Sequence, residues 1–398
     1  MTVSPTPLAV KRAFLKHLRR LGLDPDARLR LVLTKNAVRG LHAAHRRERD
    51  ADEVAFVQEH APRLLHHFAE GHDVDPARVA PELVPVASGT DEAALFRLAT
   101  RLWSVPVSRG FGRRLRYLVR DRHNGKLVGL LALGSPVFNL AARDAHVGWT
   151  VRDREARLTR VMDAYVLGAV EPYASLLGGK LVGSLVGSAE VAADFAAKYA
   201  DVQGRISGRR ERPDLVLVTT TSSLGRSSVY NRLRLRAPDG SDLVRFEPVG
   251  YTAGHGHFHV PEPLFEAMRL LLVARGRAFA SSAEYGSGPN RRLRILREGL
   301  EAAGVDAALA RHGVQREVFC VPTVPDWRAV LLGDHARSVH GRPSAETLGR
   351  AAVERWVVPR AVRRPSYRLW TRAELADRLD LRLQMATGGQ ARPIAWAA

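Results

Sequence analysis

The sequence contains one cysteine, Cys320, in 398 residues. A single thiol excludes an internal disulfide and any zinc site built from several cysteines. Its apolar neighbours in VFCVP predict a buried strand thiol rather than a nucleophile. Long apolar runs are missing too, since none reaches the ~18 residues of a membrane-spanning helix. The first segment, MTVSPTPLAVKRAFLKHLRR, lacks an apolar signal region, so we expect a cytoplasmic protein with no membrane partner.

Lysine is also scarce, because only six of the 61 basic residues are lysines and arginine supplies the rest. A genome rich in G and C explains the choice of arginine, but not the surplus of basic over acidic residues. With 41 acidic residues, the formal net charge is +20. Such a surplus attracts polyanions and predicts a nucleic-acid partner, with DNA favoured. The alternative is a basic protein whose charge serves no particular partner.

Hydrophobic patterning divides the chain into three predicted regions. Residues 1–85 place apolar residues at helical spacing, as in KRAFLKHLRRLGL, and predict a helical N-terminal region. Residues 86–262 mix strand-like and helix-like patterns and predict an α/β core. Residues 263–398 predict a basic, mainly helical C-terminal region.

Within the predicted core, RLRYLVRD and KLVGLLALGS flank Asn124-Gly125 and predict a β-hairpin. HVGWTV predicts a third strand, and the zone that begins with RLTRVMDAYVLGAVEPYASLL predicts helices. DLVLVTTTSS predicts the clearest buried strand of the chain, and RFEPVGYTAGHGHFHV predicts a last one.

Two glycines begin a predicted helix in this zone. Gly178, Gly179 and Lys180 precede an apolar run, and glycines at a helix start let backbone N–H groups approach an anion. The segment lacks the GxxxxGK[ST] spacing of a Walker loop and contains no GxGxxG. It predicts a weak phosphate site, and an ordinary helix junction is the alternative.

The segment TTTSSLGRSSVYNRL crowds hydroxyl groups and arginines around Gly225, at a predicted turn from strand to helix. Small hydroxyls, helix N–H groups and guanidinium groups are donors that bind phosphate. The alternative is capping, in which one serine satisfies the N–H groups of the next helix. We predict nucleic-acid or phosphate contacts from Ser222, Ser223, Arg226, Ser227, Asn231 and Arg232.

Histidines alternate in GHGHFHV, which would place His255, His257 and His259 on one face of a strand. Such imidazoles could hold a metal, or one could act as a general base near neutral pH. No carboxylate or cysteine is adjacent in the sequence, so we predict no metal site and take His257 as a catalytic candidate. Structural histidines at a sheet edge are the alternative.

Two basic segments lie in the C-terminal region. The loop and helix start GSGPNRRLR predict a second phosphate contact. The tail RWVVPRAVRRPSYRLW interleaves arginines with aromatic residues, a composition typical of single-strand-binding surfaces, although the aromatics could equally be buried anchors. The phosphate-contact residues predicted here are Asn290, Arg291, Arg292 and Arg294.

Motifs spread from about residue 82 to residue 370 resemble the family of Druantia anti-phage system proteins DruA. This resemblance implies a role in a multi-gene defence system, beside a large helicase-type partner. The motifs are WSVPVSRGFGRRLRYLV, LGSPVFNLAARDAHVGW, VMDAYVLGAVEPYASLLGGKLVGSL, TTTSSLGRSSVYNRLRL, GYTAGHGHFHVP, GPNRRLR and WVVPRA.

The order of a central strand, a short helix with a tyrosine and a Gly-aromatic strand start resembles the second half of GNAT acyltransferases. This resemblance implies a GNAT-like mixed sheet, with an acyl-CoA-like donor held at Gly178, Gly179 and Lys180. It also implies Tyr230 as the acid that protonates the leaving thiolate. The Q/R-x-x-G-x-G/A signature of that family is not intact here.

Three functions therefore stay open. The first is a nucleic-acid-binding defence component that uses a GNAT-like fold as a scaffold. The second is a transferase that modifies nucleic acid or protein, with one cleft joining Gly179, Ser223, Tyr230 and His257. A weaker resemblance to the Mom family of phage DNA-modification proteins, in YN and GYT, points the same way. The third is a metal-dependent nuclease that uses the histidines with Asp144, although clustered carboxylates are lacking.

Overall fold

The computed structural model describes residues 5–21, 23, 35–107, 112–201, 214–254, 257, 259–281, 289–333, 341–392 and 394–395. The chain forms two compact units. We call Met1–Arg49, Ser104–Pro106 and Ala253–Gln315 the helical unit. We call Asp50–Trp103, Val107–Thr252 and Arg316–Ala398 the sheet unit. Among the described residues, no helix combines the length and apolarity needed to cross a membrane.

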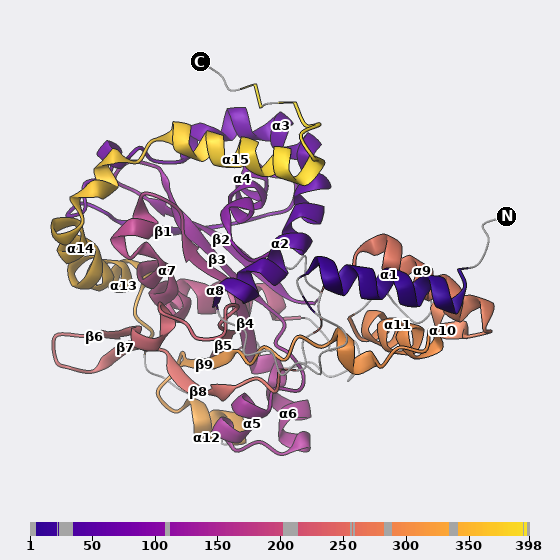
Figure 1. The fold of residues 1–398 in the computed structure, drawn as a ribbon. Coiled ribbons are helices and arrows are strands. Elements are labelled where there is room, and N and C mark those ends of the chain that lie inside the picture. Colours follow the sequence, from indigo (N-terminus) through magenta and orange to yellow (C-terminus); the bar gives the residue numbers. More distant parts are fainter. Residues whose placement is uncertain are drawn as a thin grey trace. The chain divides into compact units, whose positions relative to one another are not determined.

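The sheet unit is built on seven strands in the order β1-β2-β3-β4-β5-β9-β8 (Figure 1). Neighbouring strands pair antiparallel, except β4 and β5, which run parallel. The sheet is therefore mixed, as the α/β prediction required. The strands are β1 Pro81–Pro85, β2 Arg114–Asp121, β3 Leu127–Gly134, β4 Val161–Ala169, β5 Leu217–Thr221, β8 Glu247–Tyr251 and β9 Glu317–Pro322, and a separate hairpin joins β6 Arg234–Arg236 to β7 Asp242–Arg245.

Helices cover both faces of this sheet. Leu115 and Tyr117 of β2 belong to the core cluster that includes α7, α8 and α13. Leu118 points to the opposite face, where it packs with α3, α4 and α15. The helices of the unit are α3 Val54–Leu64, α4 Asp91–Ala99, α5 Ala141–Val147, α6 Val151–Arg157, α7 Gly178–Ser184, α8 Ala189–Tyr199, α12 Trp327–Leu332, α13 Ala345–Ala352, α14 Val358–Arg363 and α15 Arg372–Thr387.

The helical unit has a core of its own. Phe14 of α1 is fully buried and packs with Met268 of α9 and Ile295 of α11. Thr6 begins α1 by accepting a hydrogen bond from the Ala9 N–H at 3.2 Å, which is the expected capping geometry. Its helices are α1 Pro7–Arg20, α2 Lys35–Ala51, α9 Glu262–Ala274, α10 Ala278–Ser281 and α11 Pro289–Ala302, and α2 ends just inside the sheet unit.

Several local predictions are confirmed. The hairpin of β2 and β3 forms, and Gly125 in its loop has φ +72°. The predicted strand DLVLVTTTSS contains β5, and Cys320 is fully buried in β9. Strands β1 and β9 also extend the sheet beyond the predicted core of residues 86–262.

Two strand and helix predictions were wrong. HVGWTV is not a strand, because it spans the end of α5, a left-handed Gly148 and the start of α6. The following zone, predicted as helical, contains β4. Val161, Ala164 and Tyr165 match helical spacing, and a strand covered on both faces lacks the alternation that would identify it.

The last predicted strand is shorter than expected. β8 ends at Tyr251, and His257 forms only an isolated bridge with Arg311. His255 lies outside the described residues, so the three-histidine face stays partly untested.

Helix α7 begins with two glycines that have different surroundings. A Cβ on Gly178 would lie 2.6 Å from the Tyr173 carbonyl oxygen and 2.9 Å from the Ala169 Cβ. A Cβ on Gly179 would have one contact, with Val229 at 3.8 Å. Close packing therefore explains the glycine at 178, but not the glycine at 179.

We predict that Gly178→Ala lowers the free energy of unfolding by about 1–3 kcal/mol, because the new methyl group overlaps fixed backbone. The matched variant Gly179→Ala should be neutral or stabilising by up to about 1 kcal/mol, since alanine favours the helix. Urea denaturation of both variants measures the difference. Equal destabilisation would contradict this account of the helix start.

Candidate phosphate-binding site

The hydroxyl-rich turn after β5 folds back onto one buried carboxylate. Ser222 donates its N–H to the Glu317 carbonyl at 2.9 Å, and Ser227 donates its N–H to the Glu317 carboxylate at 3.0 Å. Glu317 in turn donates its N–H to the Gly225 carbonyl at 2.9 Å. Gly225 has φ +83°, a conformation that favours glycine. Glu317 was not among the predicted site residues, because only the β5–β9 pairing brings it here.

Ser227 performs the capping role that was the alternative to phosphate binding. Its hydroxyl oxygen accepts hydrogen bonds from the N–H groups of Val229 at 3.2 Å and Tyr230 at 2.9 Å. Both bonds lead into the short 3-10 helix Tyr230–Arg232, where the sequence predicted a helix. Ser227 is therefore engaged, and Ser222 is buried.

The other predicted residues of this turn are accessible. Arg226 and Arg232 are exposed, and Ser223 and Asn231 are half-buried. These four side chains remain our predicted phosphate contacts in the sheet unit.

The candidate acid Tyr230 is held inside an aromatic cluster. Its ring stacks on Phe246 at 5.3 Å and meets Phe319 edge-on at 5.7 Å. Its hydroxyl donates to the Leu167 carbonyl at 3.2 Å. Burial raises the pKa of Tyr230 well above its usual value, and the nearby Asp163 adds to this. The hydroxyl therefore stays protonated, but acting as an acid would first require breaking its bond to β4.

The parallel strands β4 and β5 separate close to this hydroxyl. Their pairing consists of three residue pairs and ends at Asp163 and Thr219. Beyond that point, the Thr220 hydroxyl donates to the Ala164 carbonyl at 2.8 Å. Hydroxyl groups thus satisfy β4 carbonyls where the neighbouring strand no longer does.

Asp163 is a functional candidate that the sequence analysis missed. Burial raises the pKa of its carboxyl group to about 6, against the effects of the Thr219 hydroxyl and of Arg143 and Arg114. The Thr219 hydroxyl donates to its Oδ1 at 2.8 Å. A single aspartate in the apolar run VMDAYVLGA could have indicated a buried carboxyl group. The sequence analysis assigned this run to a helix and did not single out the aspartate.

Three cations gather near the start of α7. Burial lowers the pKa of Lys180, and the positive charges of Arg232 and Arg355 lower it further. The Lys180 ammonium lies 5.4 Å from the centre of the Trp356 ring. Lys180 and Arg232 were predicted for two different sites, and the structure brings them together. An anion placed here would relieve their mutual repulsion.

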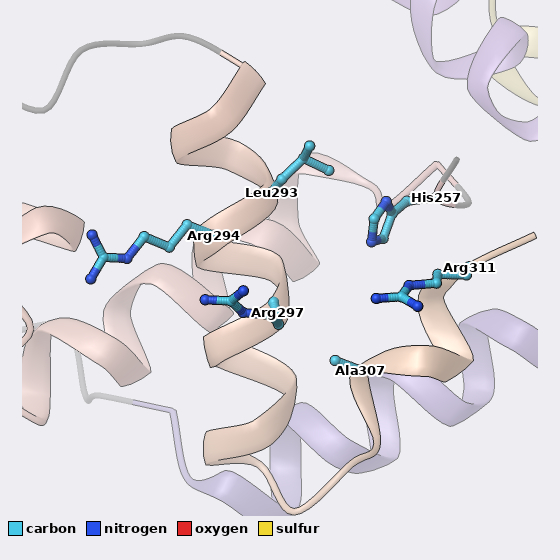
Figure 2. A pocket seen from close by; sticks show the side chains of 6 residues that line it. All are labelled: His257, Leu293, Arg294, Arg297, Ala307 and Arg311. Carbon is cyan, nitrogen blue, oxygen red and sulfur yellow. The ribbon is translucent and has the colours of Figure 1, made fainter. Parts of the chain in front are cut away.

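The helical unit contains a second cationic region, a pocket of about 360 Å³ beside α11 (Figure 2). None of the described residues that line it is acidic. In Figure 2, His257 and Arg311 lie on the same side of α11, whereas the Arg294 guanidinium extends away from them. The lining residues are His257, Leu293, Arg294, Arg297, Ala307 and Arg311.

The arginines that were predicted in this region have structural partners. Arg291 donates to the Phe279 carbonyl at 3.1 Å. Arg292 forms an ion pair with Glu262 at 3.0 Å. Arg294 forms one with Glu298 at 2.9 Å. The side chain of the fourth predicted residue, Asn290, lies outside the described part of the chain.

Arg297 and Arg311 are the pocket residues that sequence reasoning missed. Arg297 lies 3.8 Å from Glu298, a carboxylate that Arg277 and Arg294 also approach within 4 Å. Within the described residues, Arg311 has no carboxylate at ion-pair distance. The pocket therefore carries more positive charge than its surroundings neutralise.

The histidines of GHGHFHV have different neighbours. His257 lines the pocket, whereas His259 contacts the carboxylate of Glu48 and stacks on His45 at 4.0 Å. The His17 ring lies 2.7 Å from the His259 carbonyl. No group of three potential metal ligands occurs among the described residues. His257 and Tyr230 belong to different units, so the predicted cleft that joins them stays a prediction.

Comparison with known proteins identifies the family. The family model described as Druantia protein DruA matches residues 32–333. The Druantia protein DruA of Escherichia coli (strain UMEA 4076-1) is 45% identical over 372 residues, covering 92% of this chain and 91% of that protein. The chain belongs to the Druantia protein DruA family. Membership in the DruA family supports a role in antiviral defence. No solved structure matches the chain.

The raised pKa of Asp163 predicts a pH dependence of stability. Because the folded carboxyl titrates near pH 6 and an unfolded one near 4, ionisation destabilises the fold as pH rises between these values. Asp163→Asn keeps an acceptor for the Thr219 hydroxyl and cannot ionise. The variant should therefore avoid the loss of stability that ionisation causes. Its free energy of unfolding at pH 7 should exceed that of wild type by up to about 3 kcal/mol. Urea denaturation across this pH range measures the effect.

The control is Asp377→Asn, on the exposed side of α15. It should leave the wild-type pH dependence in place. A wild-type stability that is flat from pH 4 to pH 6, or an Asp163→Asn variant that keeps the slope, would contradict the assignment.

Proposed function

We propose that this member of the DruA family binds DNA in antiviral defence, through contacts with the phosphate backbone. The observation that carries the proposal is the cationic pocket of the helical unit, beside α11, which we call the arginine pocket. It gathers cationic side chains around a space of about 360 Å³ without an acidic lining residue among those described. Phosphate is the abundant anion of nucleic acids, and guanidinium groups bind it with paired hydrogen bonds.

The composition of the pocket suits a phosphodiester. Arg297 and Arg311 supply permanent charge, and His257 supplies ring nitrogens that can hydrogen-bond to a phosphate. Leu293 and Ala307 add apolar surface against which a sugar could pack.

The sheet unit offers a further contact in Lys180, Arg232 and Arg355. Burial lowers the pKa of Lys180, the charges of Arg232 and Arg355 lower it further, and a polyanion would offset the repulsion among the three cations. The formal charge of +20 supplies the long-range attraction. The family resemblance implies a helicase-type partner, and we propose that this partner acts on the same DNA.

The second candidate is a GNAT-like transferase that modifies nucleic acid or protein. One observation favours it: a single parallel pair, β4 and β5, separates inside an otherwise antiparallel sheet, with Tyr230 at the separation. Other observations oppose it. Gly178 is explained by packing, and the Ala164 and Leu167 carbonyls are already bonded by hydroxyl groups. An acyl-CoA-like donor would have to displace these contacts.

The third candidate, a metal-dependent nuclease, has less support. Asp144 is bonded by the guanidinium groups of Arg143 at 2.7 Å and Arg154 at 2.8 Å. A carboxylate neutralised in this way is a poor metal ligand.

We predict that Arg311→Gln weakens DNA binding about tenfold and lowers the slope of log affinity against log salt by about 1, since one phosphate contact is lost. The matched control is Arg275→Gln, which removes the same charge from an exposed position outside the pocket. It should change affinity by less than about twofold. Fluorescence anisotropy with short labelled DNA at several salt concentrations measures both.

A thermal-shift comparison separates the candidate functions. DNA should stabilise the wild-type chain, and acetyl-CoA should not. Strong stabilisation by acetyl-CoA alone would favour the transferase. Absence of DNA binding at low salt would remove the proposal.

A further inference from the structure

The sheet unit contains an aromatic pocket of about 430 Å³. One wall is the Trp103 ring, which lies so close to β4 that a Cβ on Gly168 would come within 2.8 Å of it. Trp370 forms another part of the lining, and Leu102 and Leu375 add apolar surface. The pocket belongs entirely to the sheet unit and is separate from the arginine pocket.

The pocket also contains a polar group with unused hydrogen-bonding capacity. Glu171 also lines the pocket and uses one carboxylate oxygen to accept the Ser175 N–H at 3.0 Å. Its other oxygen can accept a further hydrogen bond.

Arginines accompany the aromatic lining. The Arg378 guanidinium lies 4.6 Å from the centre of the Trp370 ring, and its side chain is exposed. Arg378 forms no ion pair with a described residue. Arg382 also lines the pocket and is paired with Asp50 at 3.2 Å. An exposed cation beside an aromatic pocket suits a ligand that joins an aromatic ring to an anion.

We propose that this pocket binds an unpaired nucleobase, so that the chain prefers single-stranded over duplex DNA. The inference rests on the proposed DNA-binding function and names its substrate class. A base carries a flat π-face for the tryptophans, an N–H group for the second Glu171 oxygen and a backbone phosphate for Arg378. Bases in a duplex are stacked and paired, so they cannot enter such a pocket. An apolar peptide side chain would use neither the second Glu171 oxygen nor the Arg378 charge.

The first test uses Trp370→Leu, which keeps an apolar side chain and removes the stacking ring. We expect affinity for a short labelled single strand to fall about tenfold, while affinity for the matching duplex stays within about twofold. The control Trp327→Leu lies in a separate core cluster and should change neither value. Anisotropy measures binding, and circular dichroism with temperature checks that each variant is folded.

The second test keeps Trp370 and fills the pocket. Ala174 lines it, so Ala174→Leu should exclude the base and reproduce the selective loss of single-strand binding. With adenosine monophosphate as the probe, saturation-transfer NMR should detect the base protons with wild type and lose them with Ala174→Leu. This readout needs no DNA, so it tests the pocket even if the proposed DNA binding fails.

The outcomes are distinct. Selective loss of single-strand binding in both variants, with nucleotide signals that depend on residue 174, supports the base pocket. Equal losses for single strand and duplex, or nucleotide signals unaffected by Ala174→Leu, overturn it. If the chain binds no DNA but the base protons of adenosine monophosphate still receive saturation, the base pocket is supported and the proposed DNA-binding function is contradicted.

Discussion

The three residue pairs between β4 and β5 hold the two parts of the sheet together. Strands β1 to β4 form one antiparallel block, and β5, β9 and β8 form the other. Beyond these pairs, the Thr220 and Tyr230 hydroxyls bond the Ala164 and Leu167 carbonyls of β4. A buried carbonyl without a partner is costly, so hydroxyl-bearing residues are required here for the fold itself. Part of the polar cluster after β5 is thus structural. The Glu317 carboxylate stabilises the turn that follows by accepting the Ser227 N–H.

Part of the arginine surplus is structural as well, because several arginines are neutralised inside the fold. Arg143 is completely buried, bonded to Asp144 and to two carbonyl groups, so its charge is used inside the fold. Arg292 and Arg294 likewise have carboxylate partners. Net charge therefore measures attraction to a polyanion but does not locate the binding surface. The informative residues are cations that line a pocket and have no carboxylate partner among the described residues, as Arg311 does in the helical unit.

Local signals explain what the sequence could predict. The turn glycine Gly125 revealed the β2–β3 hairpin, and the apolar run before Thr219 revealed β5. β4 was misassigned because a central strand packed on both faces has no alternation, and its apolar spacing also fits a helix. The arginine pocket was only half predicted, because His257 and Arg311 are distant in sequence and α11 brings Arg297 beside them. Burial, which raises the pKa of Asp163, is likewise a property of the folded sheet.

The two pockets have complementary chemistry, and this bears on the choice of ligand. The pocket in the helical unit is cationic and suits a phosphate, whereas the pocket in the sheet unit is aromatic and suits a base. A small donor such as acyl-CoA also carries phosphates and a base, but at fixed spacing, so it would require one particular arrangement of the units. A polymer repeats both groups along its length and can occupy both pockets in many arrangements. The proposed DNA ligand is therefore the one that would fill both pockets with the fewest geometric conditions.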